Sequence, residues 1–149
     1  MFHLRPATPK DVGPLFSIHR AVMHEHVDRV WSWDEAEQER RFRDYAARAH
    51  LEVIEVEGEI AGFVHIETRL EEIEIANIEL APAFQDRGIG SAILRRTLAR
   101  ARELGVPVTL QVLKVNPEAR ELYTRLGFSH VGETATHDVL RIDPAAPPP

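Results

Sequence analysis

The sequence predicts a mixed α/β domain with a central, mostly antiparallel sheet of six to seven strands, flanked by about four helices. Three observations lead to this class. Short runs of β-branched residues are bounded by turn residues, the segments between them show helical spacing of apolar residues, and the two kinds of segment alternate in a particular order. That order is strand, helix, helix, three strands, helix, strand, helix and two strands. The third helix connects two strands as a crossover, so we expect one parallel pair in the sheet.

Local signals place the individual elements. Thr8 followed by Pro9 and Asp11 is typical of a helix start, and Gly105 with Pro107 of a helix end. Residues 24–34 carry two histidines and two tryptophans among acids and show no clean period. In chain order the predicted elements are strand 2–5, a helix after Thr8, helix 35–48, strands 51–56, 60–68 and 72–81, helix 88–104, strand 106–112, helix 118–126, and strands 128–133 and 137–142.

Length and composition indicate one globular domain. The chain has 149 residues, of which 44% are hydrophobic and 28% charged, enough for one core and too few for two. We expect a single domain over 1–142, followed by a disordered alanine and proline tail over 143–149. No run is long enough to span a bilayer, no signal peptide is visible and cysteine is absent, which favours a cytoplasmic protein without a membrane partner. A formal net charge of −6 argues against a nucleic-acid partner.

The stretch from Ile73 to Leu94 carries the clearest functional signal. A β-compatible run ends at Pro82, and helical spacing resumes after a polar turn that contains Gly88 and Gly90. Such a turn lets N–H groups point outward together beside the positive end of the next helix, which suits phosphate. Turns with two glycines also occur without a ligand, and on the turn alone both interpretations have similar weight. The P-loop ending and the third glycine of a dinucleotide fingerprint are missing, so ATP and NAD are weaker candidates.

This turn resembles the Q/R-x-x-G-x-G/A signature of the GNAT superfamily of acyl-CoA-dependent N-acetyltransferases, with Gln85, Gly88 and Gly90 at the matching positions. The strand before it also matches, with Leu80 and Pro82 at the expected offsets. The resemblance implies the GNAT fold and acetyl-CoA as the co-substrate.

A second run, from Val112 to Phe128, is similar to the other cofactor motif of the family. Asn116 opens a short helix, Tyr123 lies within it, and Gly127 with Phe128 ends it. Two motifs in the expected order are more specific than either alone, and the resemblance extends to about Ile142.

The resemblance also implies how acetyl-CoA is held. Backbone N–H groups of Leu80 and Ala81 would bind the pantetheine and thioester, and Asn116 would contact the same arm. The pyrophosphate would lie on the turn formed by Gln85, Asp86, Arg87, Gly88, Ile89, Gly90 and Ser91. No metal is expected, because His24 and His26 are two residues apart and no third ligand stands out.

Acyl transfer to an amine needs a proton acceptor, donors for the developing oxyanion, and a proton for the departing thiolate. By resemblance, Tyr123 lies where the family often has its general acid; the alternative is a packing aromatic. Glu74 and Glu79 are the candidates for the base, since a carboxylate within so apolar a strand suits a proton acceptor. Glu74 stands eleven residues before Gln85, where histone-acetylating members carry their catalytic glutamate, and Glu79 is closer to the cofactor. A water chain is the third alternative.

Three further side chains are candidates for the acceptor side. Trp31 and Trp33 either line a substrate pocket or serve as lid or core aromatics. Asn77 either orients the substrate or caps a strand bond. The acids of the central strand together with these aromatics favour a cationic amine over an anionic one.

The predicted function is that of an N-acetyltransferase, which moves the acetyl group of acetyl-CoA to a primary amine of a small molecule or peptide. Because the chain has no cysteine, we expect direct attack in a ternary complex rather than a thiol acyl-enzyme. The alternative is a catalytically weak acyl-CoA-binding sensor or interaction module. The sequence leaves open the identity of the amine, the acyl preference beyond acetyl, and whether the chain forms a homodimer.

Overall fold

The computed structural model describes residues 1–144, and within this part of the chain seven strands and four α-helices are present. The strands form one sheet in the order β1-β2-β3-β4-β5-β7-β6, and the predicted mixed, mostly antiparallel class is confirmed. No helix of the described part is both long enough and apolar enough to cross a bilayer. The elements are β1 (Phe2–Pro6), η1 (Pro9–Asp11), α1 (Val12–Trp31), α2 (Glu35–Arg48), β2 (Glu52–Val56), β3 (Glu59–Thr68), β4 (Ile73–Leu80), η2 (Pro82–Phe84), α3 (Ile89–Leu104), β5 (Val108–Leu113), α4 (Pro117–Arg125), β6 (Ser129–Glu133) and β7 (His137–Ile142).

The largest difference from the predicted elements is the length of α1. The helix continues to Trp31 through a segment in which the sequence showed no period. Beyond Met23, Val27 is the buried residue of α1, so this part of the helix has no apolar face that could produce a periodic pattern. Of the predicted tail, 145–149 lie outside the described residues.

Contacts group the chain into two compact units. The first comprises residues 1–65 and 77–90, and the second comprises residues 66–76 and the chain from Ser91 onward. Strands β3 and β4 therefore contribute residues to both units.

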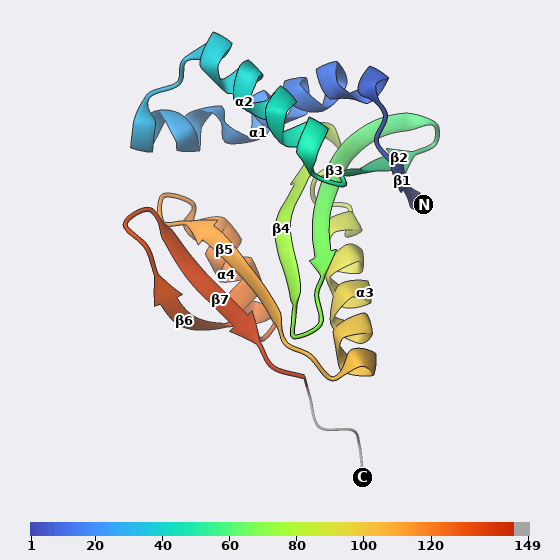
Figure 1. Cartoon of the computed structure of the whole chain (residues 1–149), viewed down its shortest axis with the longest axis vertical. Helices are drawn as coiled ribbons and strands as arrows, with labels where there is room; N and C mark the ends of the chain where they lie inside the picture. Colours follow the sequence, from blue (N-terminus) through green and yellow to red (C-terminus); the bar gives the residue numbers. More distant parts are fainter. Residues whose placement is uncertain (145–149) are drawn as a thin grey trace. The chain divides into compact units, whose positions relative to one another are not determined.

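The first unit combines the strands β1, β2 and the first part of β3 with the helices α1 and α2. Both strand pairs, β1 with β2 and β2 with β3, are antiparallel. Helices α1 and α2 lie side by side (Figure 1). They share an apolar core with the strands, made of Leu15, Phe16, Phe42, Leu51, Val53 and Phe63. This core fixes the helix face that carries His19, described below.

The second unit contains the parallel strand pair. Residues Ile73–Ile75 of β4 pair in parallel with Val108–Leu110 of β5, as expected for strands joined by a crossover helix. On its other side β5 pairs antiparallel with β7, which pairs antiparallel with β6 (Figure 1). The sheet thus combines one parallel pair with antiparallel ones.

Candidate active site

The end of β4 carries a buried carboxylate that is paired with a histidine. Glu79 is 3% exposed. The Nδ1 atom of His19, on α1, lies 2.9 Å from Oε1 and 3.0 Å from Oε2 of Glu79. Because an ionised carboxylate can only accept hydrogen bonds, the ring N–H at Nδ1 is the donor. A buried carboxylate without such a partner would be costly, so the histidine stabilises the charge at this position.

Aromatic rings surround the imidazole of His19. It stacks on Phe42 of α2, with ring centroids 5.0 Å apart, and contacts the rings of Phe16 and Trp33 at 6.4 Å. The indole N–H of Trp33 donates to Glu35 at 2.9 Å, which fixes the ring orientation. The histidine side chain is therefore held by packing as well as by its hydrogen bond.

A glycine on β3 allows the close approach of the β4 backbone at Glu79. A Cβ atom built at Gly62 would lie 2.0 Å from the Glu79 carbonyl oxygen and 3.0 Å from the Cα atom of Leu80. Real Cβ atoms do not approach backbone this closely, so only glycine fits without moving the strand. Gly62 thus helps to place the glutamate that pairs with His19.

The turn that follows β4 is the segment predicted to bind phosphate. The side-chain amide of Gln85 donates to the carbonyl oxygen of Leu80 at 2.9 Å and ties the turn to the strand end. Asp86 and Gly88 have φ angles of 61° and 79°. A Cβ atom at Gly88 would meet nothing within 4 Å, so the backbone is open to a ligand there. Binding of a pyrophosphate by backbone N–H groups of these residues stays a prediction.

The backbone N–H of Ala81, which was expected to bind the pantetheine, forms a hydrogen bond with β3. The N–H of Ala81 donates to the carbonyl oxygen of Ala61 on β3 at 2.8 Å. The contact of this N–H with the cofactor stays a prediction, and it would require that the bond to Ala61 be shared or replaced. This hydrogen bond joins β3 to the residue after β4, next to the close approach of the two strands at Gly62.

In the second unit, the second motif forms α4. Asn116 is the N-cap of this helix, and its side-chain oxygen accepts from the N–H of Ala119 at 3.3 Å. Tyr123 packs edge-on against Phe128, with ring centroids 5.8 Å apart. Burial raises the pKa of the Tyr123 phenol above its ordinary value, because the phenolate would be poorly solvated. The phenol therefore stays protonated at neutral pH, as a proton donor must.

The sequence model of the Acetyltransferase (GNAT) family matches residues 16–128, which is most of the chain. The chain belongs to the GNAT family. It is 32% identical over 82 residues to a ribosomal protein bS18-alanine N-acetyltransferase of Haemophilus influenzae, covering 55% of this chain and 56% of that protein. It is 37% identical over 86 residues to a 5-NmdU N-acetyltransferase of Pseudomonas phage PaMx11, covering 56% and 60%. The chain spans about half the length of the curated relatives it matches.

Solved structures share the GNAT fold over nearly the whole chain. The PaiA N-acetyltransferase from Thermoplasma acidophilum, in complex with coenzyme A, aligns with a TM-score of 0.77 at 14% identity, over 96% of this chain and 99% of that one. The ribosomal-protein-S18-alanine N-acetyltransferase from Escherichia coli aligns with a TM-score of 0.67 at 21% identity, over 99% and 97%. The fold implied by the resemblance is confirmed.

The two glutamates proposed as base in this GNAT domain have different surroundings. Glu74 accepts from the guanidinium of Arg69 at 2.7 Å, and its side chain is 32% exposed. Glu79 has a histidine partner instead, which can itself exchange a proton. Asn77 is half-buried on β4, and its role in orienting a substrate stays a prediction.

The two tryptophans differ in exposure and in their contacts. Trp33 is half-buried and contacts His19, as described above. Trp31 ends α1 with 55% of its surface exposed. A pocket-lining role therefore suits Trp33 better than Trp31. His24, considered and rejected as a metal ligand, contacts the Trp33 ring at 4.8 Å.

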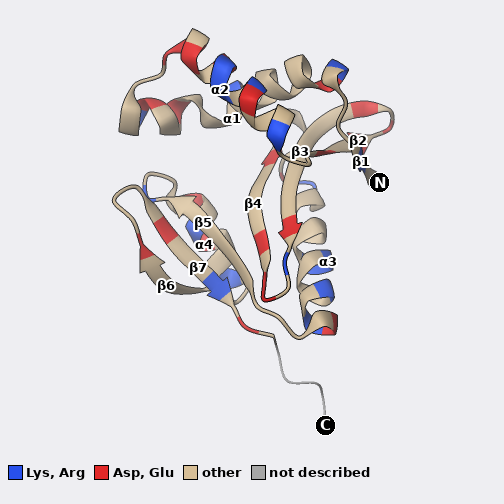
Figure 2. Ribbon diagram, in the orientation of Figure 1, with Lys and Arg blue, Asp and Glu red and all other residues tan. Residues whose placement is uncertain are grey.

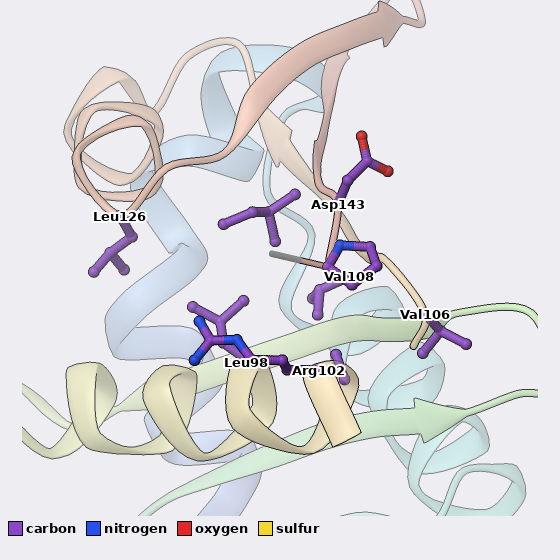
Figure 3. A pocket seen from close by; sticks show the side chains of 9 residues that line it. Leu98, Arg102, Val106, Val108, Leu126 and Asp143 are labelled. Atoms are coloured by element: carbon purple, nitrogen blue, oxygen red, sulfur yellow. The ribbon is translucent and has the colours of Figure 1, made fainter. Parts of the chain in front are cut away.

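An apolar pocket of about 130 Å³ lies in the second unit (Figure 3). Leu98 and Arg102 of α3 and Leu126 after α4 contribute to its wall. Its volume is well below the roughly 300 Å³ at which small-molecule sites begin, so it is too small for acetyl-CoA. Arginines along α3 give that helix basic segments (Figure 2), and one of them, Arg100, pairs with Glu103 at 3.2 Å.

Two residues of the site were missed by sequence reasoning. Neither His19 nor Gly62 was assigned a functional role from the sequence. The partner of His19 is 60 residues away in the chain, and no local pattern indicates such a pairing. Gly62 lies within an apolar run, where an isolated glycine in a strand is the signal that could have indicated a close backbone approach.

Proposed function

We propose that this chain transfers the acetyl group of acetyl-CoA to a primary amine of a small molecule or peptide, by direct attack in a ternary complex. The observation that carries the proposal is the buried Glu79 and His19 pair, which lies in the same unit as the open turn at Gly88. A proton-accepting pair and a phosphate-binding turn are what amide-forming acyl transfer from acetyl-CoA requires. We place this activity in a domain over residues 1–142.

In the proposed reaction the amine nitrogen attacks the thioester carbonyl carbon, and the carbon–sulfur bond breaks. One proton leaves the amine for the pair formed by Glu79 and His19. The departing thiolate takes a proton from Tyr123, whose raised pKa keeps the phenol protonated until then, and the resulting phenolate regains a proton from water. Glu74 is the weaker choice for the base, because Arg69 is bound to its carboxylate. Acetyl-CoA supplies the acetyl group as an activated thioester.

For the acceptor, we propose an amine that is cationic in solution. The relatives act on different acceptors by their names: ribosomal protein alanine, streptothricin and 5-NmdU. The support comes from the surroundings of Trp33, whose indole N–H is bound by Glu35 and whose backbone N–H donates to Asp28 at 2.7 Å. Carboxylates beside an aromatic ring attract ammonium groups.

A thiol-release assay tests the proposed function. Acetyl-CoA is supplied with a polyamine, a peptide with a free α-amine, and an acidic amino acid, and release of the CoA thiol is followed with a disulfide reagent. We expect turnover with the first two acceptors and little with the third. Binding of acetyl-CoA by calorimetry without turnover of any amine would instead support the sensor alternative. A faster reaction of the acidic acceptor would contradict the cationic preference.

A further inference from the structure

Glu79 is the stronger of the two candidate glutamates for the base, yet its carboxylate is poorly placed to meet an amine directly. Its side chain is 3% exposed, and both oxygens lie on the same nitrogen of His19. The histidine side chain is 17% exposed. An amine arriving from solvent therefore reaches the imidazole before it reaches the carboxylate.

The hydrogen bond also decides which ring nitrogen is basic. With Nδ1–H donating to Glu79, the neutral imidazole has its lone pair on Nε2. No hydrogen-bond partner of Nε2 is found among the described residues. We propose that Nε2 of His19 takes the proton of the attacking amine, and that Glu79 is the positioning residue that holds the ring in this tautomer. This inference rests on the proposed function.

The proton that leaves the amine is held by the pair of His19 and Glu79. The amine loses one proton to Nε2, and the ring becomes an imidazolium whose positive charge faces the Glu79 carboxylate. A buried anion in contact with Nδ1 stabilises that cation. After product release, Nε2 returns the proton to water, and the pair is ready for the next turnover.

Three aromatic rings contact the imidazole of His19, and charged groups contact those rings. Phe16, Phe42 and Trp33 contact the ring. The guanidinium of Arg20 lies over the Phe16 ring at 5.6 Å and pairs with Glu35 at 2.5 Å. Two further titratable groups reach Trp33: His24 contacts its ring, and Asp28 accepts from its backbone N–H. Within the described residues 1–144, Glu79 is the charged group hydrogen-bonded to the imidazole, so its charge has the strongest effect on the ring.

The decisive variant is His19→Asn. Asparagine keeps an N–H donor near the Nδ1 position and removes the ionisable nitrogen. Rates of the wild type are measured against pH with two acceptors whose amines titrate differently, a peptide α-amine and a lysine side chain. Where the rate rises over the same pH range with both acceptors, that limb of the pH–rate profile reports a group of the enzyme rather than the amine. We expect His19→Asn to abolish this limb and to lower kcat/KM about a hundredfold or more.

Two further variants separate the roles within the pair. Glu79→Gln should keep the limb, shifted to lower pH, because the anion that stabilises the imidazolium is gone. His3→Asn is the matched control, since His3 forms a histidine–glutamate pair with Glu55 at 2.7 Å on the surface. It should leave the profile unchanged. A limb that survives in His19→Asn and disappears in Glu79→Gln would make Glu79 the base and overturn the inference.

A second measurement does not depend on turnover. Nitrogen-15 NMR of the histidine rings, assigned with the His19→Asn variant, should show Nδ1 of His19 protonated and Nε2 unprotonated in the neutral form. The opposite tautomer would overturn the inference. If His19→Asn does not fold, His19→Gln also lacks the ionisable group and serves in its place. Failure of the wild type to acetylate any amine would contradict the proposed function, whereas an active enzyme with an unchanged profile in both His19 variants would contradict this inference alone.

Discussion

A Cβ atom at position 62 would lie 2.0 Å from the carbonyl oxygen of Glu79, so Gly62 and Glu79 are joined by backbone contact as well as by the sheet. Glu79 in turn holds His19 through both carboxylate oxygens. The position of the proposed catalytic pair thus depends on the absence of a side chain on the neighbouring strand. A single methyl group at Gly62 would push β4 away and change the geometry of the pair.

We therefore expect Gly62→Ala to lower turnover at least tenfold and to destabilise the protein by about 1 to 3 kcal/mol, the cost of an overpacked core position. Gly13→Ala is the matched control. A Cβ atom at Gly13 meets nothing within 4 Å, and alanine is favoured in a helix, so stability should be kept or slightly raised. Steady-state rates and urea unfolding of both variants check this. Normal turnover of Gly62→Ala would show that the strand adjusts without affecting the pair.

Gly88→Val should weaken acetyl-CoA binding sharply, because a branched side chain blocks approach to the backbone of the turn. Gly58→Val is the control for backbone strain. The φ angles at Gly58 and Gly88 are 80° and 79°, and neither position has an atom within 4 Å of an added Cβ. Both variants should lose similar stability, but only Gly88→Val should lose affinity in calorimetry. Gln85→Ala should have a milder effect, since it removes the single bond to Leu80. Equal affinities of all variants for acetyl-CoA would show that its pyrophosphate binds at another part of the protein.

Tyr123→Phe should lower kcat by about tenfold to a thousandfold and leave acetyl-CoA affinity nearly intact, as expected for an interaction made mainly in the transition state. Burial raises the pKa of the Tyr123 phenol. Deprotonation of this phenol should therefore not reduce the wild-type rate below about pH 10. Tyr45→Phe removes the other tyrosine hydroxyl, which contacts Nδ1 of His65 at 2.6 Å, and should reduce stability rather than rate. An unchanged rate for Tyr123→Phe would assign the ring to packing.

The first helix turn should make stability depend on pH. The guanidinium of Arg5 and the N–H and hydroxyl groups of Thr8 hold the pKa of buried Asp11 well below its usual range. A lowered folded-state pKa stabilises the protein above the unfolded carboxyl pKa, near 3.9, and this contribution is lost as pH falls below it. Asp11→Asn should thus cost about 1 to 3 kcal/mol at pH 7, and less near pH 3, in urea unfolding.

Glu37→Gln provides the comparison for Asp11→Asn. Hydrogen bonds from Arg40 and Arg41 lower the pKa of Glu37 to about 2, but its side chain is 37% exposed. Water screens such a pair, so its removal should change stability little. If the two variants lose the same free energy of unfolding at pH 7, burial does not explain the contribution of the Asp11 contacts to stability.

Local patterns predicted those parts of this protein that local chemistry controls. Helix α2 follows directly from Asp34 as its cap, which accepts from the N–H of Glu37 at 3.0 Å. The bounds of α3 and the open turn at Gly88 likewise follow from glycine and periodicity. The end of α1 was not predictable in this way, because its last turns bury little apolar surface and leave no pattern.

The sequence by itself determined the strand and helix order, the acetyltransferase signature from Gln85 to Gly90, and the candidates Tyr123 and Glu79. Only the tertiary structure decided that Glu79 pairs with His19 and that Gly62 makes room for its backbone. The reason is physical: a turn or helix signal lies within a few residues, whereas a buried carboxylate takes its partner from whichever element the core brings to it. For Glu79 that element is α1, whose position is set by the shared core of Phe16, Phe42 and Phe63.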